Sequence, residues 1–397
     1  MMTILRNLLY DKAYSLFCIL GTALTFILVT SLLQIVFMLG SNYPPDIHAD
    51  RVISLGTFSD IDGRNVGGLQ HWEIDLLLGH IKEHEAVALR SSDIGNVLVN
   101  DKNYLVGMAF VNAGFWKVYG FNFLAGGAVT EDDYRDRKHY AIINKKLSNK
   151  LFHTTYSVGQ KLEYYGVEVE IKGVVDDVSP LATPTGYSEM WMPGFVNNRI
   201  SAVDILFPTR MDMSRAKEMV SHAVQQTFAQ RNVQVQVSAD KLFTTRESKL
   251  QKVGGERGVG GSVGVLLFIL LLIPAVNIVT LAMSNTRGKL KEIAVRRAFG
   301  ASRFSAFLDI MAGNLVLVLI GVFLGVALVK PTYYLIQHTV LQNPFLEGVS
   351  LIPNIDAIVI VLFILPLMLL FLLMFGGIPA YRAARQNIAT ILKGGMS

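Results

Sequence analysis

Cysteine is almost absent from this 397-residue chain, because the only one, Cys18, lies inside an apolar run near the N-terminus. A single cysteine cannot form a disulfide within the chain or build a cysteine-ligated zinc site. The sequence therefore excludes a disulfide-stabilised scaffold and leaves no Cys nucleophile for catalysis.

Motifs that bind nucleotides or hydrolyse substrates are missing as well. No GxxxxGK[S/T] phosphate loop, Rossmann glycine pattern or HExxH motif occurs, so the chain cannot cradle ATP in the P-loop manner by itself. We predict that the chain is not an enzyme. A membrane-anchored enzyme is a remote alternative, because no set of residues has the pattern of a catalytic site.

Metal ligands at a firm spacing are also lacking. His80 and His84 stand four residues apart on a predicted helix, with His71 or Glu83 nearby, but no third ligand is placed by the sequence. Residues 60–63, Asp-Ile-Asp-Gly, resemble the start of a calcium loop without its later ligands, and a turn is predicted instead. We therefore expect no metal and no cofactor in this chain.

Charge is scarce and unevenly spread. The chain is 51% hydrophobic and 17% charged, which is too apolar for an ordinary soluble protein and too charged for one that lies wholly in a membrane. Much of the net charge of +5 sits beside apolar runs, where basic residues face anionic lipid and set topology. We therefore expect lipid contact and no nucleic-acid partner.

Four apolar runs are long enough to cross a bilayer, which takes about 20 residues. They span residues 14–40, 260–283, 307–330 and 355–377. The first run could be a signal peptide, but it is too long and no small-x-small cleavage site follows it. The fold class predicted is an α+β membrane protein with four transmembrane helices, arranged one plus three around a large extracytoplasmic α+β domain.

The orientation follows from residues 287–303, where six basic residues stand against one acid. Short loops this rich in Lys and Arg stay in the cytoplasm. The remaining segments are then a cytoplasmic N-terminus (residues 1–13), the extracytoplasmic domain (41–259), a cytoplasmic loop (284–306), an external loop (331–354) and a cytoplasmic tail (378–397).

The extracytoplasmic domain alternates between strand-like and helix-like patterns. Two β-α-β halves, about residues 45–112 and 200–247, flank an inserted subdomain of about residues 113–199. Strands are predicted at residues 51–58, 87–90, 95–99, 104–111, 140–143, 161–165, 167–175, 202–207 and 232–237. Helices are predicted at residues 71–83, 145–152 and 214–229, the last capped by Asp212 or Ser214.

Few polar groups interrupt the apolar runs. They are Gln34, Asn277, Asp309 and Asn314, and they make no charged relay of the kind that a proton-coupled carrier needs. Pro274 and Pro366 are predicted to kink their helices.

Glycine marks two places in the membrane part. Gly321 and Gly325 form a small-residue face that suits helix packing, either within the chain or in a dimer. Six glycines in residues 248–264 predict a flexible or broken joint before the second run, with a close helix crossing at Gly260 and Gly264 as the alternative.

The basic loop has helical spacing. Leu290, Ile293, Ala294 and Ala298 could share one face, and Glu292 stands four residues before Arg296, the spacing of a helical ion pair. Such a helix suits docking on a soluble partner or a purely topogenic role.

Residues 291–303, KEIAVRRAFGASR, resemble the cytoplasmic loop of MacB/FtsX-type ABC transporter permeases. Residues 115–124, 141–144, 157–160 and 169–177 look like the MacB-like periplasmic core domain of that family, and residues 378–392 resemble its C-terminal segment. Departures are Asn387-Ile388 where Asp-Pro is common, the glycine-rich joint, and the lack of a fused ATPase domain.

The resemblance implies a permease subunit that exports peptides, antibiotics, lipids or lipoproteins by mechanotransmission. The partners implied are an ABC ATPase that binds ATP and magnesium, a second permease chain in a homo- or heterodimer, and a periplasmic adaptor with an outer-membrane duct. The location implied is the bacterial inner membrane, with both termini cytoplasmic. The ATPase-coupling residues implied are Glu292, Ile293, Arg296, Arg297, Gly300 and Arg303, with Gly300 ending the loop helix.

Two other functions stay open at this point. One is FtsX-like regulation of a cell-wall hydrolase, although the external domain is much smaller in FtsX proteins. The other is a membrane sensor that reports an external ligand and transports nothing. Co-purification with an ATPase separates the sensor from the transporter.

Overall fold

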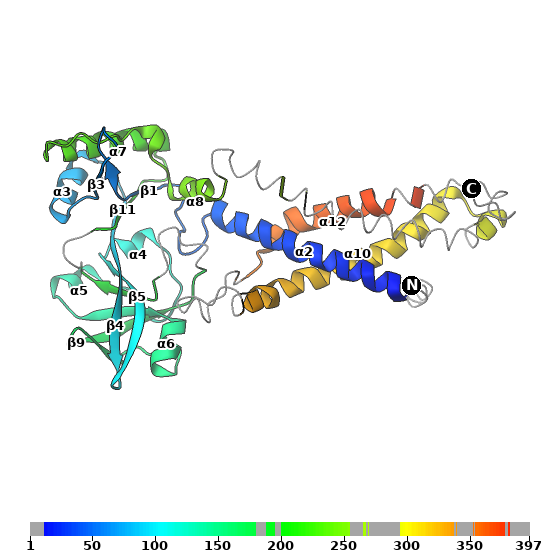
Figure 1. The fold of residues 1–397 in the computed structure, drawn as a ribbon, viewed down its shortest axis with the longest axis horizontal. Helices are drawn as coiled ribbons and strands as arrows, with labels where there is room; N and C mark the ends of the chain where they lie inside the picture. Colours follow the sequence, from blue (N-terminus) through cyan, green and yellow to red (C-terminus); the bar gives the residue numbers. More distant parts are fainter. Residues whose placement is uncertain are drawn as a thin grey trace. The chain divides into compact units, whose positions relative to one another are not determined.

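The computed structural model describes residues 12–179, 188–194, 200–254, 265–266, 269, 294–336, 339, 352, 354–377 and 380–381. The chain divides into two compact units, each described separately below (Figure 1). The sheet unit comprises Met38–Gly255 and Ile336–Pro353. The helical unit comprises Met1–Phe37, Glu256–Leu335 and Asn354–Ser397.

A nine-stranded sheet forms the centre of the sheet unit, in the order β1-β11-β4-β5-β10-β7-β9-β6, with β8 paired to both β4 and β9. Its strands are β1 (Val52–Leu55), β4 (Ala86–Val99), β5 (Lys102–Val111), β6 (Phe123–Gly126), β7 (Tyr140–Asn144), β8 (Lys161–Tyr164), β9 (Val167–Val175), β10 (Met190–Pro193) and β11 (Ala202–Leu206). A separate hairpin consists of β2 (Phe58–Ser59) and β3 (Asn65–Gly67).

The sheet unit also contains several helices. They are α3 (His71–His80), α4 (Phe115–Val118), α5 (Glu131–Arg135), α6 (Lys145–Phe152), α7 (Met213–Ala229), the short 3-10 turn η2 (Ala239–Lys241) and α8 (Thr245–Gly254). Helix α7 starts as predicted, because the Asp212 side chain accepts a hydrogen bond from the Ser214 N–H. The core beside α3 and α7 contains Leu77, Val220 and Phe228.

The middle of the sheet is covered on both faces, as the alternation along β5 shows. Met108 and Phe110 belong to a core cluster that includes Leu147 of α6. Ala109 and Val111, which point the opposite way, belong to a cluster that includes Phe115 of α4. The sheet is therefore a buried layer here, and apolar residues on both of its faces stabilise it.

The segment of residues 113–199, expected as an inserted subdomain, contributes β6 to β10. These strands continue the sheet of the flanking residues, since β10 pairs in parallel with β5 and antiparallel with β7. Pairing along this seam satisfies backbone groups that a separate subdomain would leave at an edge.

Several strand predictions need correction. Residues 51–58 contain two strands of different sheets, β1 and β2. Residues 87–90 and 95–99 belong to one strand, β4, which pairs with β5 from Arg90 to Val99. Residues 232–237 form no strand, although Val235 makes an isolated bridge with Asp60 and the Gln236 N–H donates to the Ser59 carbonyl of β2 at 3.0 Å. Val235 and Val237 do face the core, so the alternation reflects burial beside β2 without a full strand, and the second β-α-β half lacks its last strand.

The helical unit contains α2 (Lys12–Gly40) and α10 (Arg303–Ile336), followed by α11 (Ala357–Val359), η5 (Ile360–Ile364), α12 (Leu365–Phe371) and η6 (Leu372–Gly377). Among the described residues, two helices are long and apolar enough to cross a membrane, Ser15–Gly40 and Leu315–Ile336, and Ala357–Leu370 is a shorter apolar helix. Helix α10 extends past the predicted end at residue 330, through Pro331. The predicted second span, residues 260–283, lies almost entirely outside the described residues, as does Pro274.

The last helix is irregular near its proline. The turn Ile360–Ile364 just before Pro366 is π-helical. A proline removes one backbone donor and crowds the preceding turn, which a wider turn accommodates. The segment Leu372–Gly377 is π-helical as well, without a proline, and the kink expected at Pro366 stays a prediction.

Candidate functional site

The basic loop contains a short helix that ends in the way its sequence predicts. Residues 294–298 are helical, and Gly300 has a φ of +99°, in the left-handed region. The Gly300 N–H donates to the Arg297 carbonyl and the Ala301 N–H to the Arg296 carbonyl, both at 3.1 Å. This pair of bonds is a Schellman cap with glycine at its C′ position, which confirms that Gly300 ends the loop helix.

Helix α10 begins directly after this cap. The Ser302 Oγ accepts a hydrogen bond from the Ser305 N–H at 3.1 Å, and the Ser302 carbonyl accepts one from the Ala306 N–H. The sequence Phe-Gly-Ala-Ser-Arg is thus a C-cap followed by an N-cap. The loop helix is therefore joined to α10 by a short, hydrogen-bonded turn.

Basic and aromatic side chains surround this turn, and we call them the loop-helix surface: Val295, Arg296, Phe299, Arg303 and Phe304, all exposed. Phe299 is 89% exposed, the highest value for a large apolar residue among those described. Ala294, on the other side of the helix, is buried. The surface can therefore offer positive charge together with an aromatic side chain.

The predicted coupling residues are only partly placed. Arg296 and Arg303 lie on the loop-helix surface, Arg297 is half-buried beside it, and Gly300 shapes the turn. Glu292 and Ile293 lie outside the described residues, and so does the predicted ion pair of Glu292 with Arg296. Phe299 and Phe304 were not predicted, although aromatic residues flanking a helix-ending glycine are a signal that could have found them.

Two glycines bring α10 close to α2. A Cβ added at Gly321 would lie 2.6 Å from the Thr22 Cβ, and one at Gly325 would lie 2.7 Å from the Ala23 carbonyl oxygen. No real Cβ comes so near a backbone oxygen, so only glycine permits this approach. The small-residue face therefore packs within the chain.

The other polar groups of the apolar runs are accounted for in part. Gln34 of α2 donates from Nε2 to Asp356 Oδ2 at 2.6 Å, and its Oε1 accepts from the Asp356 N–H at 3.0 Å. The Gln34 side chain thus binds the residue that caps α11. The side chains of Asp309 and Asn314 are not described, and Asn277 lies outside the described residues.

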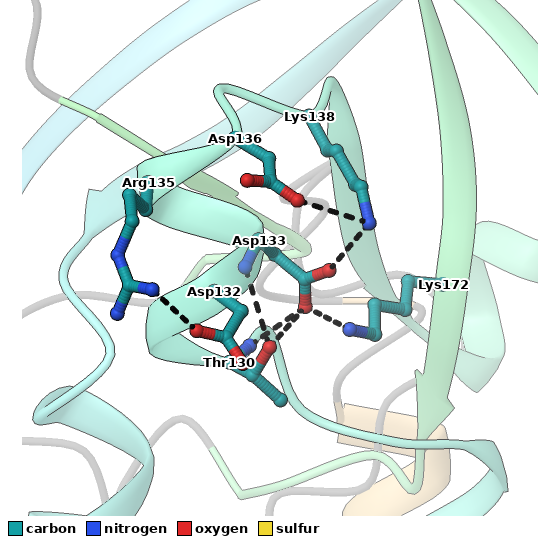
Figure 2. Close-up of polar contacts among 7 residues, drawn as sticks. All are labelled: Thr130, Asp132, Asp133, Arg135, Asp136, Lys138 and Lys172. Carbon is teal, nitrogen blue, oxygen red and sulfur yellow. Dashed lines mark hydrogen bonds and ion pairs between the residues drawn. The ribbon is translucent and has the colours of Figure 1, made fainter.

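A charged cluster in the sheet unit surrounds Asp133 of α5 (Figure 2). Asp133 accepts hydrogen bonds from the Thr130 N–H, the Thr130 hydroxyl and Lys172, and Lys138 lies 3.7 Å from its other oxygen. Burial alone would raise the pKa of Asp133, but the bonds from Lys172 and Thr130 outweigh it and hold that pKa well below its usual range. Asp133 therefore ties α5 to β9, and its oxygens are already in use.

The two metal candidates of the sequence behave differently from ligands. His84 Nδ1 lies 3.0 Å from the Ile81 carbonyl oxygen. Asp60 Oδ1 accepts hydrogen bonds from the N–H groups of Asp62 and Arg64 around Gly63, which confirms the predicted turn. Across the described part of the chain, no group of three His, Cys, Asp or Glu side chains could hold a metal ion.

Comparison with known protein families places both parts of the chain. The MacB-like periplasmic core domain family matches residues 15–248, which is more than half of the chain. The FtsX-like permease C-terminal family matches residues 264–388, which include the loop-helix surface.

Individual relatives are distant. The chain is 22% identical over 231 residues to the uncharacterized ABC transporter permease YknZ of Bacillus subtilis (strain 168), and the alignment covers 55% of each protein. The chain thus spans about half the length of this curated relative.

Solved structures of two extracytoplasmic regions are similar. The periplasmic region of MacB from Actinobacillus actinomycetemcomitans has a TM-score of 0.40 at 13% identity, covering 48% of this chain and 90% of that one. The extracellular domain of the ABC-type transporter YknZ from Gram-positive bacteria has a TM-score of 0.39 at 20% identity, covering 47% of this chain and 99% of that one.

Proposed function

This chain belongs to the family of MacB/FtsX-type ABC transporter permeases, and from that membership we propose that it couples ATP hydrolysis in a separate ATPase subunit to movement of its extracytoplasmic domain. ATP and magnesium bind to the partner, and this chain is the non-catalytic subunit. The movement drives export of peptides, antibiotics, lipids or lipoproteins.

The loop-helix surface is the observation that carries this proposal. Its arginines and Phe299 are exposed at a turn that a Schellman cap and an N-cap hold in one conformation. A turn with a fixed conformation can transmit a movement of the ATPase to α10, whereas a flexible loop would deform instead. The positive charge would steer the encounter with the ATPase. Phe299 would become buried in the complex and would supply most of the binding energy.

A continuous helix supports transmission from this surface. Helix α10 begins at Arg303 and has 34 residues, so it is about 50 Å long at 1.5 Å per residue. Gly321 and Gly325 pack it closely against α2, and α2 ends at Gly40, where the sheet unit follows in the sequence. Displacement of the loop turn would therefore reach both helices.

The proposed assembly has two permease chains, identical or different, each bound to one ATPase subunit. The proposed location is the bacterial inner membrane, with both termini in the cytoplasm and the sheet unit on the outer side. A periplasmic adaptor and an outer-membrane duct would complete an exporter in a host with two membranes.

The test is a detergent pull-down of the full chain with its candidate ATPase, followed by measurement of ATP hydrolysis in proteoliposomes. Arg296→Glu should reduce recovery of the ATPase at least tenfold, because it reverses one charge on the loop-helix surface. Phe299→Ala should reduce recovery to a similar extent through loss of the anchor.

Arg215→Glu is the matched control, since Arg215 is an exposed arginine on α7 of the sheet unit. Equal recovery of the ATPase by the control and both loop variants would refute the coupling role. Recovery of no nucleotide-binding subunit by the unmodified chain would favour the sensor function instead.

A further inference from the structure

Two segments join the sheet unit to the apolar runs, and both belong to the sheet unit. The first is residues 42–51, which follow α2 and which we call the N-terminal connector. The second is α8 (Thr245–Gly254), which precedes the second apolar run. These segments touch although Asn42 and Arg246 are 204 positions apart in the sequence.

Arg246 makes the outer contacts between the two segments. Its backbone N–H donates to the Ala49 carbonyl at 2.8 Å, and its Nη2 donates to Asn42 Oδ1 at 3.0 Å. The same guanidinium lies 3.7 Å from the Asp50 carboxylate. The side chains of Arg246 and Asp50 are partly exposed, so water competes with the side-chain contacts.

The inner contact is a buried ion pair. Lys249 Nζ lies 2.5 Å from Asp46 Oδ2, and the two side chains are 1% and 2% exposed. Asp204 of β11 and Arg90 of β4, also buried, act on Asp46 electrostatically. Asp204 in turn accepts hydrogen bonds from the Tyr119 and Ser54 hydroxyls.

The connector has its own attachment to the sheet unit. The Pro45 carbonyl accepts a hydrogen bond from the Gly120 N–H at 2.8 Å, and the Arg51 carbonyl accepts one from the Phe207 N–H at 3.0 Å. A Cβ at Gly120 would meet the Ile47 side chain at 2.6 Å, so the connector is packed tightly there. It would therefore stay in place if α8 left.

Helix α8 is held mainly by polar groups. Of residues 245–251, only Thr245 and Lys249 are buried, and Leu250 is half-buried. Residues 245–251 would therefore leave the connector without exposing much apolar surface, and hydrophobic burial contributes little to the attachment of this part of α8.

Burying the Asp46–Lys249 ion pair also costs free energy, because the carboxylate loses its water. Desolvation raises the pKa of Asp46 to about 6, although Lys249 and Arg90 act to lower it. The cost of burying the carboxylate charge therefore exceeds the attraction of its partners, as is common for buried ion pairs. Such a pair fixes where α8 docks without holding it irreversibly.

We propose that α8 is a releasable strap, and that the Asp46–Lys249 ion pair is the contact that locks it onto the N-terminal connector. With the lock closed, the two membrane connections of the sheet unit move together. With the lock open, the second connection moves separately. The proposal requires no ATPase or substrate, so its test does not depend on the transporter function.

The test is amide hydrogen exchange of the full chain in detergent, read on peptides from α8, β4 and β5. Lys249→Glu places two carboxylates together, and the α8 amides should exchange at least tenfold faster while β4 and β5 keep their protection. The charge-swapped double variant Asp46→Lys/Lys249→Glu should recover at least half of the lost protection, on a logarithmic scale.

Lys217→Glu is the matched control, because Lys217 of α7 forms another ion pair of α8, with Glu247 at 2.6 Å, at a partly exposed position. It should change exchange of α8 less than threefold. If Lys249→Glu behaves like this control, or if the charge swap recovers nothing, the lock does not exist.

A cross-link covers the case in which Lys249→Glu also exposes β4 and β5. In a Cys18→Ser background, cysteines replace Gly40 and Leu250, because a Cβ at Gly40 would lie 3.7 Å from the Leu250 Cδ2. A short thiol cross-linker should restore protection of all three peptides in the Lys249→Glu chain. Continued fast exchange of β4 and β5 after cross-linking would show unfolding of the domain and would overturn the strap.

Discussion

The sheet unit and the helical unit bury polar groups in different ways. In the sheet unit, buried charges pair across long stretches of sequence, as in Glu73 with Arg231 and Asp46 with Lys249. In the helical unit, buried hydroxyls bond within their own helix, as in Thr25 to the Gly21 carbonyl and Ser31 to the Ile27 carbonyl.

The difference follows from the surroundings of each unit. Charge pairs specify which distant segments of the sequence meet. In a bilayer a charge without a partner is far more costly, so helices meet through small residues and dispersion contacts. Breaking one contact of each kind therefore tests the comparison.

The largest effect is expected at Glu73, which is fully buried. Its carboxylate accepts two hydrogen bonds from the Arg231 guanidinium and one from the Gln70 N–H at the start of α3. Glu73→Ala should lower the free energy of unfolding of the sheet unit by about 3 kcal/mol, because it leaves Arg231 without its partner. Denaturant unfolding of the full chain in detergent measures this loss.

The matched control is Glu168→Ala, which removes the exposed pair with Lys161. Exposed pairs contribute at most about 1 kcal/mol, so the unfolding midpoint should hardly move. Similar losses for the two variants would show that burial does not distinguish these pairs.

A smaller effect is expected in the helical unit from Gly325→Leu. The added side chain meets the Ala23 carbonyl oxygen and the Phe26 Cβ, and overpacking of this kind costs about 2 kcal/mol. The melting temperature in detergent should fall by several degrees. Gly21→Leu is the control, since a Cβ at Gly21 has nothing within 4 Å, and an equal fall there would refute the close helix contact.

Local rules explain which parts of this fold could be predicted from sequence. The helix Lys145–Phe152 and the strand Val167–Val175 have the predicted bounds, because an Asn144 cap and a period-2 pattern are contained in the segments themselves. The turn at Gly300 follows from the same kind of rule, since only a glycine favours its φ of +99°.

Contacts between distant segments could not be predicted in this way. Nothing within residues 232–237 tells that they meet β2 through only a short contact, and no spacing rule links Asp46 to Lys249. The exposure of Phe299 could not be predicted either, because helical periodicity does not show which apolar residues lack a packing neighbour. These features depend on tertiary packing, which periodicity does not encode.

A pH effect of about 1 kcal/mol is expected at Asp46. Its pKa in the folded protein is about 6, compared with an ordinary value of 3.8. The folded state therefore holds a proton that the unfolded chain releases between about pH 4 and 6, and stability from this group is lost as the pH rises through 6. Relative to Asp46→Asn, the unmodified chain should be more stable at pH 5 than at pH 7.

Other titratable and charged groups face Asp46 and could also change the stability with pH. They are Lys249 on α8, Asp204 on β11 and Arg90 on β4, with Tyr119 beside Asp204. The pKa of Tyr119 is raised far above its ordinary value, by burial and by Asp204, so it does not titrate in this range. Parallel stability curves for the two chains between pH 5 and 7 would show that Asp46 takes up no proton.

The smallest effect is expected where the helical unit does use a polar side chain. Gln34 and Asp356 share two hydrogen bonds at 2.6 and 3.0 Å, yet Gln34→Leu should cost only about 0.6 kcal/mol, the average for such bonds between membrane helices. The loss is small because both groups find other partners when the helices separate. Denaturation in a strong detergent should show a shift far below that of Gly325→Leu. A loss as large as that of Gly325→Leu would mean that the polar link, and not the close approach of α10 to α2, holds the helical unit together.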